Sequence, residues 1–122
     1  MDTKLLGRWG EEKAAEFLRK KRYKITGMNY ACRFGEIDVI AEDRKYVVFV
    51  EVKLRKNADF GQAREFVTPA KQRRIIAAAQ LWLAANGTEK QPRFDVVEIY
   101  TGEASRGDIR INHIQNAFEV NV

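Results

Sequence analysis

The segment at residues 46–54, with the sequence YVVFVEVKL, constrains the fold more than any other part of the chain. It is almost continuously apolar and rich in valine, which indicates a strand buried on both faces of a sheet. Glu51 and Lys53 interrupt this pattern. A Glu-x-Lys triplet usually marks a solvent-facing strand edge, but a charge in a buried strand is costly unless it is paired or bound to an ion. The segment therefore predicts a central strand that carries a charged site.

The remaining elements are predicted from hydrophobic periodicity and end signals. A helix is expected over residues 4–22. A second helix begins at Thr68-Pro69, which read as an N-cap and first helical residue, and stops at Asn86-Gly87. Strands are predicted at residues 23–30, 36–41, 46–54, 93–100 and 109–114. The order α-β-β-β-α-β-β predicts a mixed sheet covered by helices.

Composition excludes several kinds of site. Cys32 is the only cysteine and His113 the only histidine, which excludes disulfides within the chain, cysteine zinc sites and most Ser-His or Cys-His machinery. No stretch approaches the roughly 18 apolar residues of a membrane span, and the charged N-terminus is unlike a signal peptide. One domain over residues 1–122, in a reducing cytoplasm, is therefore expected.

The net charge of +5 is concentrated in one part of the chain. Residues 53–74 hold seven basic and two acidic side chains, whereas the remainder holds fifteen of each. A concentrated excess beside a candidate site favours a polyanionic partner, although a solvated surface is the alternative. Cations also oppose the dipole at the start of the second helix, which favours phosphate contacts there. The candidate nucleic-acid-binding residues are Arg55, Lys56, Lys71, Arg73 and Arg74.

Asp38 also lies among apolar neighbours, in the strand before 46–54. If the two strands form an antiparallel hairpin with a two-residue turn at Asp43-Arg44, Asp38 pairs with Phe49. Asp38, Glu51 and Lys53 then share one face of the sheet, and the two carboxylates are diagonal neighbours within reach of a common ion. A three- or five-residue loop would reverse this parity and separate them.

Two neighbouring carboxylates repel each other unless a raised pKa, a nearby cation or a bound metal relieves the repulsion. Oxygen ligands favour Mg²⁺ or Mn²⁺ over zinc. Lys53 could orient or activate an attacking water, or stabilise charge on a phosphate. Glu11, in the first helix, is a further candidate, although the helix dipole alone also explains an acid early in a helix.

Five short segments together resemble the YraN-like family of small bacterial proteins, which are described as endonucleases. That family is similar to archaeal Holliday-junction resolvases and to the PD-(D/E)xK nuclease superfamily. The segments follow the family's order and are Gly7-Arg8-Trp9-Gly10-Glu11, Gly35-Glu36-Ile37-Asp38, Phe49-Val50-Glu51-Val52-Lys53, Val67-Thr68-Pro69-Ala70-Lys71 and Arg93-Phe94-Asp95-Val96-Val97. One departure is that Ile37, and not the proline of the motif, precedes Asp38; that proline is often absent in the superfamily.

The resemblance implies an α/β fold with a restriction-endonuclease-like αβββαβ core, a mixed sheet flanked by helices. It implies that Asp38, Glu51 and Lys53 match the superfamily's acidic-acidic-lysine motif. It further implies that Glu11 matches the N-terminal helix glutamate of the resolvases. The expected catalytic residues are thus Glu11, Asp38, Glu51 and Lys53, of which Glu11, Asp38 and Glu51 would bind the metal.

We therefore expect a Mg²⁺- or Mn²⁺-dependent endonuclease that acts on DNA, branched or repair intermediates included. The alternatives are a catalytically silent nucleic-acid-binding module of the same fold and a protein whose basic loop docks an acidic partner. A two-fold homodimer is expected in the active form, because two strand cuts need two sites. Asp95 is expected to be structural, paired with Arg93 or a helix cation, and His113 to be a surface residue of an edge strand.

Overall fold

The computed structural model describes residues 3–55, 67–101 and 109–119. The predicted order of helices and strands is confirmed, with ends that differ by a few residues. The elements are α1 (Thr3–Lys20), β1 (Lys24–Cys32), β2 (Gly35–Glu42), β3 (Tyr46–Arg55), α2 (Pro69–Asn86), β4 (Gln91–Tyr100) and β5 (Arg110–Phe118). Neither described helix has the unbroken apolar length that a membrane span requires.

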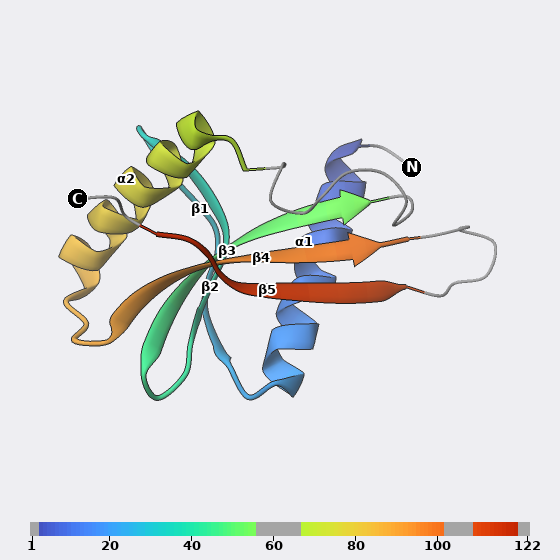
Figure 1. Cartoon of the computed structure of the whole chain (residues 1–122), viewed down its shortest axis with the longest axis horizontal. Helices are drawn as coiled ribbons and strands as arrows, with labels where there is room; N and C mark the ends of the chain where they lie inside the picture. Colours follow the sequence, from blue (N-terminus) through green and yellow to red (C-terminus); the bar gives the residue numbers. More distant parts are fainter. Residues whose placement is uncertain (1–2, 56–66, 102–108, 120–122) are drawn as a thin grey trace.

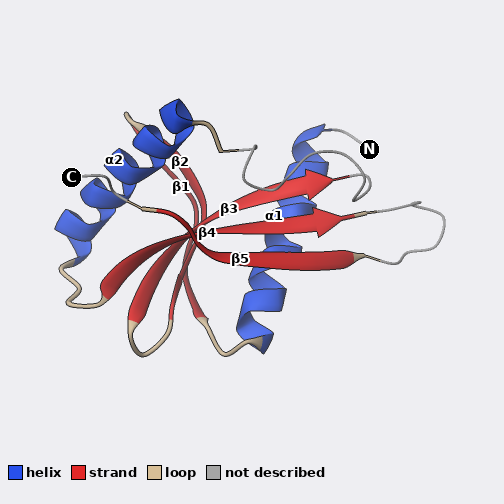
Figure 2. Ribbon diagram, in the orientation of Figure 1, coloured by secondary structure: helices blue, strands red, loops and turns tan. Residues whose placement is uncertain are grey.

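The five strands form one mixed sheet in the order β1-β2-β3-β4-β5 (Figure 2). β3 and β4 run parallel, and the other neighbouring strands are antiparallel. β3 is the central strand, as its apolar sequence predicts, and β5 lies at an edge. The α/β class, with a mixed sheet flanked by two helices, agrees with an αβββαβ-type core.

The two helices cover opposite faces of the sheet (Figure 1). Val50 of β3 packs in the same buried cluster as Leu18 of α1. The next-door residue Phe49 points the other way and meets Trp82 of α2 edge to face, with ring centroids 5.7 Å apart. Because side chains alternate along a strand, Glu51 lies on the same face as Phe49, the α2 side.

α1 approaches β3 closely at Gly10. A methyl group on Gly10 would lie 2.9 Å from Cδ2 of Leu54, so a larger residue would have to displace this leucine. The glycine therefore permits a close helix–strand contact. The following residue, Glu11, is close enough to Asp38 of β2 to act on it electrostatically.

A buried polar cluster joins β4 to β5. Asp95 is fully buried and accepts hydrogen bonds from Nε and Nη2 of Arg93, at 2.9 and 2.8 Å, and from the backbone N–H of Asn116 at 2.9 Å. Arg93 also donates to the hydroxyl of Tyr23 at 2.7 Å. The expected pairing of Asp95 with Arg93 is confirmed. The expectation that His113 is a surface residue is wrong: its side chain is 3% exposed, because Nε2 points inward and lies 2.7 Å from Asp95.

Candidate active site at a fork between two strands

The hairpin of β2 and β3 brings Asp38 and Glu51 together. Its ladder pairs Val39 with Val50, two residues further along β3 than the sequence prediction. Continuing this register by one residue places Asp38 across from Glu51, so the predicted pairing with Phe49 is wrong. A shift of two residues leaves every side chain on its predicted face. The register therefore directs Asp38 towards Glu51 and not towards Phe49, although the ladder ends at the Val39–Val50 pair.

The turn explains the shift. The backbone N–H of Asp43 donates to the carbonyl of Tyr46 at 3.0 Å, so the two central residues are Arg44 and Lys45 and not Asp43 and Arg44. The Asp43 side chain holds this turn, because its Oδ1 accepts the backbone N–H groups of Lys45 and Tyr46 at 2.9 and 2.6 Å. Short aspartate side chains commonly stabilise turns in this way.

β2 and β3 separate beyond the Val39–Val50 pair, although both strands continue. Asp38 spans the opening: its Oδ2 accepts the backbone N–H of Val52 at 2.8 Å. A side chain thus replaces the ladder hydrogen bond that a continuing strand pair would supply. The carboxylate is held in place, and among the described residues no hydrogen bond engages its second oxygen.

The charge on Asp38 is unfavourable at this position. Burial, followed by the nearby carboxylates of Glu51 and Glu11, raises the pKa of the Asp38 carboxyl to about 7. The N–H of Val52 and the ammonium of Lys71 act in the opposite direction. A site that raises the pKa of a carboxyl through neighbouring acids attracts a cation.

This shift predicts how the stability of the metal-free protein depends on pH. The folded state binds the Asp38 proton more tightly than the unfolded chain, whose pKa is about 3.9. Raising the pH from about 4 to about 7 should therefore lower the free energy of unfolding, by at most about 1.4 kcal/mol per pH unit. Asp38→Asn should remove this contribution. Urea unfolding of the wild type and of Asp38→Asn, in EDTA at pH 5 and pH 8, measures this contribution. If the stability of the two proteins depends equally on pH, the pKa of Asp38 is not raised.

Glu51 is buried at the same place and is neutralised by two lysines. Its Oε1 lies 2.5 Å from Nζ of Lys71 and 3.7 Å from Nζ of Lys53. Lys53 follows two residues later on the same strand face, whereas Lys71 comes from α2. We call the group formed by Asp38, Glu51, Lys53 and Lys71 the fork site.

The start of α2 places Lys71 at Glu51. Thr68 is the N-cap, its side chain accepts the backbone N–H of Lys71 at 3.2 Å, and Pro69 is the first helical residue. Lys71 is consequently the third residue of the helix. The sequence predicts Lys71 as a phosphate contact and carries no sign of its contact with Glu51. Thr68-Pro69 predicts where the helix begins and therefore the position of Lys71 within it. Nothing in the neighbouring sequence predicts that Glu51 is its partner.

The environment of Lys53 weakens the hold of its ammonium on its proton. Burial lowers the pKa of its ammonium, and the charge of Lys71 lowers it further, against the opposing effect of Glu51. Its side chain is 23% exposed, so that a bound molecule could reach it. A lysine whose pKa is depressed by burial and by a second cation is a common solution for general-base chemistry.

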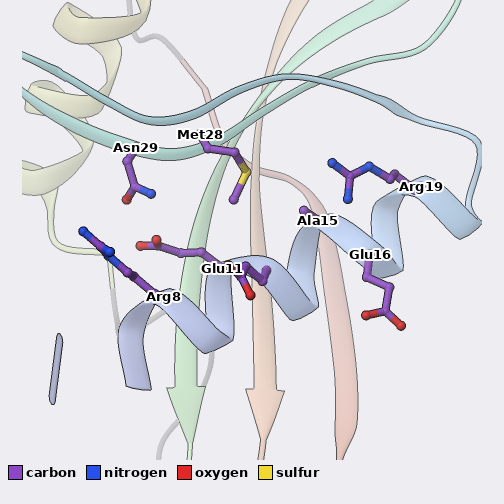
Figure 3. Close-up of a pocket in the computed structure, with 8 residues that line it drawn as sticks. Arg8, Glu11, Ala15, Glu16, Arg19, Met28 and Asn29 are labelled. Carbon is purple, nitrogen blue, oxygen red and sulfur yellow. The ribbon is translucent and has the colours of Figure 1, made fainter. Parts of the chain in front are cut away.

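Glu11 flanks the fork site from α1. It is close enough to Asp38 to raise the pKa of that carboxyl. It also lines an open groove between α1 and β1, where its carboxylate extends toward Asn29 and Arg8 (Figure 3). The groove continues along α1 past Ala15. The structure thus brings Asp38, Glu51 and Lys53 together and leaves Glu11 at their margin.

The donor set fits a hard divalent cation in part. Asp38 and Glu51 supply carboxylate oxygens, which Mg²⁺ and Mn²⁺ prefer. In the described part of the chain no three His, Cys, Asp or Glu side chains gather as a ready-made metal cluster. A Mg²⁺ ion held by one or two carboxylates completes its coordination with water and phosphate oxygens. The two opposed carboxylates meet that requirement.

The other basic candidates differ in their setting. Arg73 and Arg74 are exposed in the first turns of α2, close to the fork site along the same helix as Lys71. Arg55 is the last residue of β3 and is partly buried. Lys56 lies outside the described residues.

The family model described as "Uncharacterised protein family UPF0102" matches residues 10–99 of this chain. A UPF0102 protein of Caldanaerobacter subterraneus subsp. tengcongensis is 43% identical over 119 residues, which are 97% of this chain and 98% of the relative. One from Geobacter sulfurreducens is 47% identical over 119 residues, 97% and 91% of the two chains. One from Symbiobacterium thermophilum is 48% identical over 117 residues, 95% and 98% of the two chains. The matched region contains all four expected catalytic residues.

Proposed function

This chain belongs to the UPF0102 family, and we propose that it is a divalent-metal-dependent endonuclease that hydrolyses DNA phosphodiesters, branched or repair intermediates included. The observation that carries the proposal is the meeting of Asp38, Glu51 and Lys53 at the point where β2 and β3 separate. Their order along the chain is that of the acidic-acidic-lysine motif to which the sequence is similar. A buried and a partly buried acid that repel phosphate have no use in a protein that only binds DNA.

In this proposal Asp38 and Glu51 hold Mg²⁺ or Mn²⁺, with Glu11 beside them. When bound, the metal polarises the phosphodiester and lowers the pKa of a water molecule. Lys53, two residues after Glu51 on the same strand face, would orient the attacking water or stabilise charge on the phosphate. Arg73 and Arg74 contact backbone phosphates on the exposed side of α2.

A catalytically silent nucleic-acid-binding module of the same fold is the second candidate. Two ion pairs favour it, because Lys71 and Lys53 already neutralise Glu51. Incubation of the wild-type protein with linear and branched DNA, with Mg²⁺, Mn²⁺ or EDTA, separates the two. We expect cleavage that requires the metal. Binding without cleavage under every metal condition would leave only the second candidate.

The exposed arginines should set DNA affinity without setting sequence preference. Lysine and arginine contacts to phosphate release counterions, so affinity falls steeply with salt. Replacing Arg73 and Arg74 by alanine should reduce the slope of log affinity against log salt by up to about 2. The charge-matched control replaces Arg44 and Lys45, in the turn at the other end of β2 and β3. Fluorescence anisotropy at several salt concentrations measures the slopes, and equal slopes for the two variants would place the DNA elsewhere.

A further inference from the structure

We propose that Lys71 is an internal cation of the fork site: its ammonium neutralises Glu51 when no metal is bound, and a divalent metal must displace it in order to bind. This inference rests on the proposed function, because it concerns the same carboxylates. It adds to that function a competition between a side chain of the protein and the metal.

The Lys71 ammonium is in direct contact with Oε1 of Glu51, and this pair is a charge-assisted hydrogen bond. The Glu51 side chain is only 7% exposed, so its charge needs a partner. The charge of Lys71 also acts on Asp38, whose pKa it lowers. The ammonium thus neutralises Glu51 by direct contact and acts on Asp38 only electrostatically, from a longer distance.

A divalent metal ion and the Lys71 ammonium exclude each other at Glu51. A divalent ion on the Glu51 carboxylate would stand a few ångströms from the ammonium, and like charges at that separation repel strongly in a partly buried site. Lys53 approaches the same oxygen less closely, at 3.7 Å. Lys71, which makes the shorter contact, is the cation that has to move.

The Lys71 side chain is free to move away from Glu51. Its side chain is 35% exposed and has a flexible four-carbon stem. The residues that precede it, Thr68, Pro69 and Ala70, are exposed as well. The ammonium can thus turn from Glu51 to solvent, or to a phosphate group, without any movement of the helix.

The test compares Lys71→Met with a matched control, Lys90→Met. Lys90 also pairs with a partly buried glutamate, Glu42, at 3.2 Å and is 37% exposed, but it lies at the other end of β2. Mn²⁺ binding without DNA is measured by isothermal titration calorimetry, and thermal unfolding is recorded in EDTA and in Mn²⁺. Lys71→Met should bind Mn²⁺ about tenfold more tightly, the equivalent of one charge-assisted hydrogen bond. It should also lower the melting temperature in EDTA and gain more than the wild type from Mn²⁺.

The outcomes distinguish this inference from the proposed function. Unchanged or weaker Mn²⁺ binding by Lys71→Met, with normal binding by the wild type, overturns the inference and leaves the function standing. An equal gain in Lys90→Met also overturns it, because net charge alone would then explain the effect. Binding by Lys71→Met but not by the wild type supports it, since the lysine then blocks the site. Absence of binding in both proteins overturns the inference together with the proposed metal site.

Discussion

Glu51→Gln is expected to reduce metal-dependent DNA cleavage by at least about 10²–10³-fold while the domain stays folded. The amide keeps the shape of the side chain but loses the negative charge that the metal and both lysines need. Folding should survive, because a buried charge is removed and Lys71, at 35% exposure, can turn its ammonium to solvent. Single-turnover cleavage with saturating Mn²⁺ measures the loss of rate, and thermal unfolding measures folding.

Glu42→Gln is the matched control for this substitution. Glu42 is also a lysine-paired glutamate of the same sheet, although it is less buried than Glu51 and has one lysine partner, Lys90; it lies at the far end of β2 from the fork site. Its cleavage rate should remain within about threefold of the wild type, since surface ion pairs contribute little. If Glu51→Gln cleaves as fast as Glu42→Gln, Glu51 does not take part in the reaction and the proposed site is wrong.

The order of elements and the face of each strand were predictable from local pattern. The apolar run at 46–54 could fit only a central strand, and its period of two placed Glu51 and Lys53 on one face. Because of the same period of two, the prediction that Asp38 and Glu51 share a face does not depend on the exact hairpin register, provided that any shift is even. The hairpin register was wrong by two residues, yet an even shift kept Asp38 on the face of Glu51.

The register itself was not predictable because two neighbouring turns fit the same residues. Asp43-Arg44 and Arg44-Lys45 are both polar pairs without glycine, so neither carries a distinctive turn signal. The choice depends on the Asp43 carboxylate, which accepts two backbone N–H groups only when it precedes the turn. These hydrogen bonds of Asp43 exist only in the folded turn, so the sequence alone does not show them.

The partners of Lys71 and His113 were not predictable, for a common reason. Each looks solvated from its own element, one in the first turn of a helix and the other in an edge strand. Each owes its role to an acid on a different element, Glu51 for the lysine and Asp95 for the histidine. Periodicity predicts which face of an element a residue occupies, but it does not predict which charged group of another element it will contact there.

Asp95→Ala is expected to destabilise the domain by about 3–5 kcal/mol, the usual cost of removing one partner from a buried ion pair. Asp95 is fully buried, and the Arg93 side chain is 9% exposed, so the guanidinium would be left without a counter-charge. The backbone N–H of Asn116 and the ring of His113 would lose their acceptor as well. Urea unfolding at pH 7 measures the loss.

The double variant Arg93→Met, Asp95→Leu separates an unpaired charge from a lost contact. Apolar residues of similar volume can replace a buried ion pair at little cost, so the double variant should be more stable than Asp95→Ala, although Arg93 also hydrogen-bonds Tyr23. Equal losses of stability in the two variants would mean that the lost hydrogen bonds, and not the unpaired charge of the Arg93 guanidinium, account for most of the destabilisation. A loss below about 1 kcal/mol in Asp95→Ala would contradict the role of the pair altogether, because surface substitutions alone have effects of that size.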